Sequence, residues 1–128
     1  MGSVFSIAAG AALGALLRWV LAVKFNPMFP ALPLGTLAAN LAGGYLIGVA
    51  VGVFAAWPEV SPHVRLFVIT GFLGGLTTFS TFSAEVVAQL QQGEPGWALA
   101  TAAAHMLGSF AATALGIATV SLLRQPVA

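Results

Sequence analysis

Charged residues are scarce and cysteine is absent in this sequence of 128 residues. Lysine and arginine together number 4 and aspartate and glutamate together number 3, so charged residues make up 5% of the chain, against about 25% in an ordinary soluble domain. A soluble protein of this size must cover a large surface with polar side chains, and so few ionised residues cannot cover it. The composition therefore excludes a soluble globular enzyme and a disordered chain. The count of 0 cysteines further excludes disulfides, thiolate metal sites and cysteine nucleophiles.

The basic side chains are few and scattered along the chain: Arg18, Lys24, Arg65 and Arg124. They cannot form a phosphate-binding patch, so we expect no nucleic-acid partner. Hydrophobic residues, by contrast, make up 59% of the chain, and the mean hydropathy is +1.01. These values predict an integral membrane protein whose surface contacts lipid.

Apolar runs long enough to cross a bilayer, about 20 residues each, occur along the whole chain. We expect membrane-spanning segments at Ser3 to Val23, Leu34 to Trp57, Val64 to Leu90, and Trp97 to Leu123. Proline- and glycine-rich loops separate them. The runs do not alternate with period two, so the spans are helices and not strands of a barrel. The chain is therefore predicted to be a single all-α domain covering residues 1–128.

The loop charges barely specify an orientation. Arg65 and Arg124 lie toward one side of the predicted bundle, and Lys24 and Arg18 lie toward the other. Because positive charge normally marks the cytoplasmic side, this near tie leaves the topology weakly determined. Two interpretations stay open: features other than charge orient the protein, or copies insert both ways up.

Glycines recur at the spacing that lets helices approach closely. Gly10 and Gly14 form one G-x-x-x-G pair, and Gly44, Gly48 and Gly52 form two more in register. Such pairs serve packing within a chain as well as between chains. Since four short helices are too few to enclose an aqueous pore, a transport function would require an oligomer.

The third predicted span carries the strongest signal, within Gly71–Ser83. Gly74 and Gly75 weaken the helix, and the Thr77 and Thr78 hydroxyls can bond to the backbone groups that a break would free. A break inside a membrane is tolerated only where its backbone is buried in protein or lines a cavity. Freed carbonyls bind cations in the discontinuous helices of transporters.

Aromatic and hydroxyl residues follow this segment. Phe79 and Phe82 lie three apart and share a helix face, which by itself indicates ordinary packing. Their neighbours supply polar groups at helical spacing: Ser80 with Ser83, and Thr81 with Glu85. Placed directly after the glycine pair, the set is as consistent with a functional site as with packing.

The second and fourth predicted spans each carry a polar face. Thr36 and Asn40 lie one turn apart on the second, where Asn40 could form an interhelical hydrogen bond or serve a function. His105, Ser109 and Thr113 form a stripe on the fourth, and Thr101 extends it by one turn. Several polar residues in strict register favour the lining of a path over isolated structural roles.

Hydrogen-bond donation is common to these groups. Asparagine, serine, threonine and neutral histidine all donate, and the edge of a phenylalanine ring is electropositive. No ring of carboxylates is present to attract cations. The lining therefore suits a small anion. Arg18 could make a pore mouth positive, extend toward the interface, or pair with Glu85.

The motifs resemble those of the Fluc (CrcB) fluoride channels, over essentially the whole chain. The resemblance rests on Gly14-Ala-Leu-Leu-Arg-Trp19, Gly35-Thr-Leu-Ala-Ala-Asn40 with Gly43-Gly44, and Gly71 to Ser83. It implies passive fluoride export across the inner (plasma) membrane by a homodimer of antiparallel subunits in dual topology. It further implies a third helix broken at mid-membrane, two pores per dimer and a structural Na⁺ on the twofold axis.

The resemblance also implies residue roles. Gly74 and Thr77 would bind Na⁺ through backbone carbonyls. The fluoride pore would be lined by Asn40, Phe79, Ser80, Thr81, Phe82, His105, Ser109 and Thr113. Arg18, Thr36 and Glu85 would lie at a pore mouth or support it. Some family members have tyrosine at the His105 position, so protonation of this residue has no assigned role.

Other functions remain as alternatives. A small dual-topology proton-coupled drug antiporter would also use four helices, but it needs a titratable acid on its first helix, where this chain has Arg18. A non-conducting membrane subunit would require a partner chain. An intramembrane enzyme is the weakest alternative, because His105, Ser109 and Glu85 match no catalytic motif.

Overall fold

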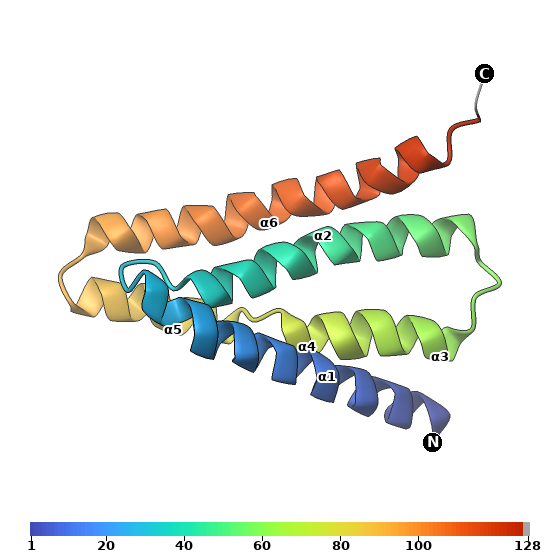
Figure 1. The fold of residues 1–128 in the computed structure, drawn as a ribbon, viewed down its shortest axis with the longest axis horizontal. Coiled ribbons are helices and arrows are strands. Elements are labelled where there is room, and N and C mark those ends of the chain that lie inside the picture. Colours follow the sequence, from blue (N-terminus) through green and yellow to red (C-terminus); the bar gives the residue numbers. More distant parts are fainter. Residues whose placement is uncertain (127–128) are drawn as a thin grey trace.

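The structure is a computed structural model that describes residues 1–126, and they form an all-helical bundle (Figure 1). Its elements are α1 (Gly2–Phe25), the 3₁₀ turn η1 (Asn26–Met28), α2 (Leu34–Ala56), α3 (Pro62–Arg65), the π-helix η2 (Leu66–Leu73), α4 (Gly74–Leu76), α5 (Ser80–Gln91) and α6 (Pro95–Leu123).

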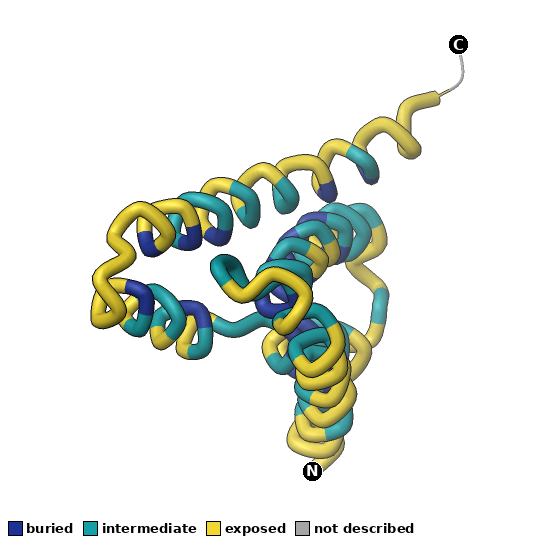
Figure 2. The backbone as a smooth tube through the Cα atoms, turned by 60° about the vertical axis from the view of Figure 1, so that its left-hand side comes forward, coloured by how far each residue is buried: buried dark blue, intermediate teal, exposed yellow. Residues whose placement is uncertain are grey.

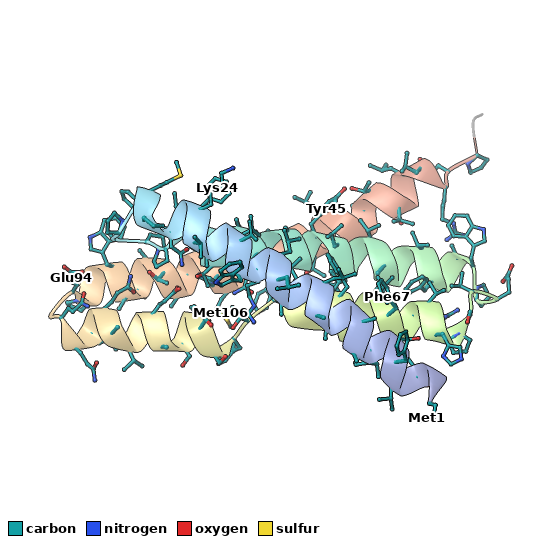
Figure 3. The ribbon with its side chains drawn as sticks, turned by 60° about the horizontal axis from the view of Figure 1, so that its bottom comes forward. Met1, Lys24, Tyr45, Phe67, Glu94 and Met106 are labelled. Atoms are coloured by element: carbon teal, nitrogen blue, oxygen red, sulfur yellow. The ribbon has the colours of Figure 1, made fainter. Side chains whose placement is uncertain are left out.

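Four helical segments are long and apolar enough to cross a membrane, as the sequence predicts. They are Gly2–Met28, Leu34–Ala56, Pro62–Gln91 and Pro95–Leu123. Each boundary lies close to the predicted one, because prolines and polar residues end each apolar run. The N-terminus, the α2–α3 connection and the end of α6 share one end of the bundle (Figure 1). Lys24 and Glu94 lie toward the opposite end from Met1 (Figure 3).

Close helix packing depends on glycine. α2 packs along α6, and α1 packs across η2 and α4. A Cβ added to Gly48 of α2 would overlap the Thr113 carbonyl of α6, and one added to Gly14 of α1 would overlap the Phe72 carbonyl. At these contacts backbone meets backbone, which a side chain would prevent. The buried residues accordingly lie on the inner faces of the helices, while the outer faces are exposed (Figure 2).

The third long segment, Pro62–Gln91, contains several backbone conformations. A π-helix precedes α4, and such i→i+5 segments are rare and often lie at functional sites. Gly74 and Gly75 lie within α4, whereas Thr77 is extended, with φ −82° and ψ 155°. Residues 77–79 separate α4 from α5. The glycine pair thus precedes the non-helical residues and is not itself unwound.

Of the two hydroxyls predicted to bond freed backbone groups, only that of Thr78 does so, because the Leu73 carbonyl that Thr77 bonds also keeps the Thr77 amide at 3.0 Å. The Thr77 hydroxyl donates to the Leu73 carbonyl at 2.8 Å. The Thr78 hydroxyl accepts from the Thr81 amide at 3.1 Å and so caps the start of α5. Gly93, with φ +74°, makes the turn from α5 to α6, a conformation that residues other than glycine rarely adopt.

Candidate functional site

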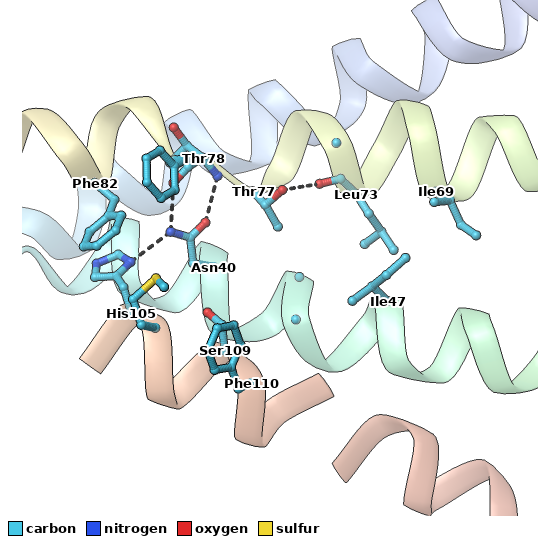
Figure 4. A pocket seen from close by; sticks show the side chains of 15 residues that line it. Asn40, Ile47, Ile69, Leu73, Thr77, Thr78, Phe82, His105, Ser109 and Phe110 are labelled. Atoms are coloured by element: carbon cyan, nitrogen blue, oxygen red, sulfur yellow. Dashed lines mark hydrogen bonds between the residues drawn. The ribbon is translucent and has the colours of Figure 1, made fainter. Parts of the chain in front are cut away.

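The Asn40 side chain is bonded to the backbone of Thr78. Its Nδ2 donates to the Thr78 carbonyl at 2.9 Å, and its Oδ1 accepts from the Thr78 amide at 2.7 Å (Figure 4). Asn40 lies on α2 and is 8% exposed. Because Thr78 belongs to the non-helical residues, its peptide groups lack helical partners, and the asparagine amide supplies both. Leaving either group unpaired in a buried position would cost about 1–3 kcal/mol.

His105 of α6 completes this polar group. The distance from Asn40 Nδ2 to His105 Nδ1 is 2.9 Å. The imidazole is 2% exposed and stacks on the Phe82 ring, with centroids 4.4 Å apart and an angle of 21° between the planes. Its other nitrogen, Nε2, is buried without a hydrogen-bond partner. A buried polar atom without a partner requires an explanation, and a ligand or water is one.

The two phenylalanines contact each other directly. The Phe79 and Phe82 rings meet edge to face, with centroids 5.5 Å apart and an angle of 83°. Phe82 is buried, at 7% exposed, whereas Phe79 is 72% exposed. A row of rings therefore runs from the open face of the chain at Phe79 through Phe82 to His105.

A cavity of about 390 Å³ adjoins this row (Figure 4). Among the residues predicted from the sequence, its lining includes Asn40, Gly74, Thr77, Phe79, Phe82, His105 and Ser109. Apart from Thr78, the rest of the wall is glycine and apolar side chains, with Ile47, Ile69 and Leu73 among them. Residues from α2, α4, α5 and α6 thus converge on one space, as lining residues of a path would.

Some predicted residues lie outside this lining. The Thr113 hydroxyl donates to the Gly44 carbonyl at 2.9 Å and so joins α6 to α2. Ser80 is exposed, with its hydroxyl 3.5 Å from that of Thr78. Thr81 contributes its backbone amide to the Thr78 cap.

The backbone carbonyls of residues 74–77, next to the non-helical residues, lack their i→i+4 partners. For Gly74 and Thr77 the cause is visible. In a continuous helix the Gly74 carbonyl would accept from the Thr78 amide, but that amide donates to Asn40. The Thr77 carbonyl would likewise accept from the Thr81 amide, which donates to the Thr78 hydroxyl. Side chains thus divert both amides and free both oxygens from their i→i+4 bonds.

Arg18 contacts the same region from α1. Its Nε donates to the Gly75 carbonyl at 3.0 Å. Of the sequence alternatives for Arg18, pairing with Glu85 is wrong, because Arg18 bonds to this carbonyl and the Glu85 Oε2 atom has no partner. The arginine places a positive charge beside the freed carbonyls.

A second polar cluster joins Thr36 and Glu85, which the family resemblance places near one end of the pore without pairing them. The Thr36 hydroxyl donates to Glu85 Oε1 at 2.7 Å. Asn26 of η1 completes the cluster, since its Oδ1 accepts from the Thr36 amide at 3.0 Å and its Nδ2 donates to the Thr36 hydroxyl at 3.3 Å. Thr36 is 1% exposed, so the cluster anchors the start of α2 to α5.

Several buried polar atoms without a hydrogen-bond partner lie on helices α5 and α6. Among residues 1–126, the buried side-chain nitrogen and oxygen atoms without a hydrogen-bond partner are Glu85 Oε2, Gln89 Oε1, Thr101 Oγ1 and His105 Nε2. Residues 85 and 89 lie one turn apart on α5, and residues 101 and 105 lie one turn apart on α6. The two helices pack against each other, so these atoms lie along a single helix pair.

A cation here would need ligands other than clustered carboxylates, imidazoles or thiolates, such as backbone oxygens. Within residues 1–126, no group of three or more histidine, cysteine, aspartate or glutamate side chains is placed to hold a metal. Backbone carbonyls are hard oxygen ligands that suit such ions as Na⁺ or Ca²⁺.

Sequence reasoning missed three residues of these clusters. Thr78 was expected only to bond to the backbone, yet its peptide holds Asn40. Asn26 and Gln89 were not singled out, because both lie near span ends, where polar residues are common. Gln89 donates to the Ala31 carbonyl at 2.9 Å, and proximity to this loop could not be read from the sequence.

Known proteins resemble this chain closely. A family model described as CrcB-like protein, Camphor Resistance (CrcB), matches residues 5–117. A protein of Burkholderia cenocepacia named fluoride-specific ion channel FluC is 63% identical over 117 residues, which are 91% of each chain. A protein of that name from Tolumonas auensis is 59% identical over 123 residues, 96% of this chain and 97% of the relative. Another, from Burkholderia pseudomallei, is 60% identical over 124 residues, 97% of each chain.

Proposed function

The chain belongs to the CrcB family, and from this premise we propose that it is a fluoride-selective channel that exports fluoride passively across the inner (plasma) membrane. Four membrane-capable helices make it a multi-pass membrane protein. The observation that carries the proposal beyond the relatives' names is the buried contact of Asn40, Phe82 and His105 beside a cavity. We propose that it catalyses no chemical reaction.

A fluoride ion entering this cavity would lose part of its water. The polar groups that it meets are neutral donors and ring edges, which stabilise an anion without binding it as tightly as a fixed cation would. Ser109 and the other hydroxyls of the route would add weak sites. Several weak sites in a narrow path let a small ion enter and leave, while a larger chloride fits poorly.

The functional unit that we propose is an antiparallel homodimer with two pores. Phe79 is 72% exposed although it belongs to the row of rings, and Gly74 is exposed beside it. A second copy covering this face would complete the lining. The near-equal loop charges are consistent with insertion in both orientations, which an antiparallel dimer requires.

We further propose that Na⁺ binds at the interface, between α4 and α5, where the third helix would be broken at mid-membrane. The family resemblance indicates the Gly74 and Thr77 carbonyls, and both lack their helical partners, as the Gly75 and Leu76 carbonyls between them also do. Two carbonyls from each of two subunits would give about four hard oxygen ligands. The ion would supply a fixed positive charge, which biases the nearby field toward anions.

Fluoride efflux from liposomes that contain only this purified chain tests the proposal. We expect rapid fluoride efflux, measured with a fluoride electrode, and chloride efflux no faster than from empty liposomes. Efflux that appears only with a pH gradient would instead support the proton-coupled antiporter. Absence of efflux from correctly inserted protein would support a subunit that needs a partner chain.

A further inference from the structure

The Thr77 side chain is held at both of its branches. Its hydroxyl donates to the Leu73 carbonyl at 2.8 Å. Its Cγ2 methyl group lies against Gly43 of α2, where an added Cβ would overlap it. Because threonine is branched at Cβ, fixing the hydroxyl and the methyl group together holds the side chain in a single χ1 rotamer. Gly43 is thus a seat for this methyl group, which a larger residue would close.

Close packing of helices does not account for Gly43. The heavy atoms nearest to its added Cβ are side-chain atoms of Thr77 and Leu76. Its neighbour Gly44 differs, because a Cβ added there would lie 3.1 Å from the Ser109 carbonyl oxygen of α6. Gly44 therefore lets two backbones approach, whereas Gly43 makes room for one side chain of the third long segment.

The backbone of Thr77 is fixed on both sides as well. Its amide donates to the Leu73 carbonyl at 3.0 Å, as in a helix. Its ψ angle of 155° then leaves the helical range. The peptide that follows is held by Asn40, whose Oδ1 accepts from the Thr78 amide at 2.7 Å. Rotation about this backbone is therefore restricted before and after Thr77.

The direction of the Thr77 carbonyl follows from the peptide that it shares with Thr78. A peptide group is planar, and this one is trans, so its C=O and N–H bonds point in opposite directions. Since the N–H points to Asn40, the carbonyl points away from Asn40. Gly74, whose carbonyl is also freed, is exposed, and both Gly74 and Thr77 line the cavity.

We propose that Gly43 is a positioning residue for the cation site: it seats the Thr77 methyl group and, with Asn40 one turn away on α2, aims the Thr77 carbonyl at the Na⁺ ion. Gly43 itself contacts no ion. The inference rests on the proposed Na⁺ site and assigns the residue that shapes one of its ligands.

Moving one methyl group across this contact tests the role. Gly43→Ala adds a methyl group that overlaps the one on Thr77, so the threonine must leave its rotamer or α2 must move away. Thr77→Ser removes the opposing methyl group but keeps the hydroxyl that bonds to Leu73 and the backbone carbonyl. In the double variant, the added methyl group occupies the space that the threonine methyl group vacates.

The readout is the Na⁺ concentration that half-maximally stabilises the dimer against thermal unfolding. We expect Gly43→Ala to raise this midpoint about tenfold or more, because a displaced carbonyl binds the ion more weakly. The double variant should return it to within about threefold of the unsubstituted value, since the two residues are in contact and their effects couple. An unchanged midpoint in Gly43→Ala, or a double variant with no recovery, would overturn the proposal.

Gly108→Ala is the matched control for a methyl clash elsewhere. Its added Cβ would lie 2.7 Å from Leu41 Cδ2, so it too meets a side-chain methyl group between α2 and α6. We expect it to lower the melting temperature at every Na⁺ concentration and to leave the midpoint unchanged. A rise as large as that in Gly43→Ala would show that any packing defect weakens Na⁺ binding, against a specific role for Gly43.

The backbone angle can be observed without Na⁺ or flux. Thr77 and Thr78 form the only Thr-Thr pair in the sequence, so threonine labelled with ¹³C and ¹⁵N isolates their peptide for solid-state NMR in lipid. We expect a ψ angle of Thr77 near 155° in the unsubstituted chain and a displaced angle in Gly43→Ala.

Failure of this inference and failure of the proposed site are distinguishable. If Na⁺ does not stabilise the unsubstituted dimer, the proposed cation site fails, and with it the role of Gly43 toward an ion. If Na⁺ stabilises the dimer but Gly43→Ala changes neither the midpoint nor the ψ angle, the cation site stands and the role assigned to Gly43 fails.

Discussion

Asn40 and Thr78 are joined by two hydrogen bonds, in which one side-chain amide pairs with both polar groups of one residue's backbone. The contact joins α2 to the non-helical residues between α4 and α5. Asn40 pairs with both polar backbone groups of Thr78 and so keeps the Thr78 amide from the Gly74 carbonyl. The second hydrogen of the Asn40 side-chain amide is left for His105. A single side chain thus links the backbone irregularity to the ring that faces the cavity.

Asn40→Asp should nearly abolish fluoride conduction. The carboxylate can still accept from the Thr78 amide, but it cannot donate to the Thr78 carbonyl or to His105, and it adds a negative charge beside the anion's route. Liposome efflux measures the effect, and size-exclusion chromatography with cross-linking checks that the dimer still assembles. Efflux at the unsubstituted rate would remove Asn40 from the pore.

Phe82→Ile should reduce fluoride efflux sharply, by about tenfold or more. Isoleucine keeps much of the apolar bulk but loses the ring that stacks on His105 and meets Phe79. Chloride leak is the control for a distorted pore. Full activity in the companion variant Phe82→Leu would mean that the residue serves packing alone.

Thr36→Val should destabilise the protein by about 1–3 kcal/mol, because Glu85 Oε1 and Asn26 Nδ2 would lose their hydroxyl partner in a buried cluster. Thr36→Ser keeps the hydroxyl and is the matched control. Thermal unfolding in detergent, followed by tryptophan fluorescence, compares the two. Equal melting temperatures for both variants would show that the hydrogen bond to Glu85 adds no stability.

Gly48→Ala should lower the melting temperature, since the added methyl group would overlap the Thr113 backbone and force α2 and α6 apart. Overpacking of this kind costs about 1–3 kcal/mol. Gly96→Ala is the control: nothing lies within 4 Å of its added Cβ, so its stability should stay equal or rise slightly. Equal losses in the two variants would contradict the close-packing explanation.

Replacement of Na⁺ by a large organic cation should weaken the dimer before it alters the helices. A ligand bound only by the assembled protein stabilises that assembly in proportion to its occupancy. Cross-linking and thermal unfolding at graded Na⁺ concentrations give the readout, with helix content as the control. A Na⁺-free dimer of unchanged structure that conducts fluoride normally would defeat the proposed role of the ion.

The sequence was sufficient for the architecture. Because lipid requires long apolar runs with internally bonded backbone, hydropathy alone located four helices, and prolines and polar loops located their ends. Phe79 and Phe82 were also placed together correctly, since residues three apart share a helix face. The bond between Thr36 and Glu85 joins residues 49 positions apart and does not follow from local spacing.

What only the tertiary structure decided is where the hydrogen bonds go. The sequence allows an interhelical hydrogen bond from Asn40 but does not name its partners, which are Thr78 at a separation of 38 residues and His105 at 65. Helical spacing places residues on faces within one helix but does not say which faces meet or in what register. Those contacts, fixed by glycine packing between helices, determine which carbonyls are freed and which nitrogen of His105 meets Asn40.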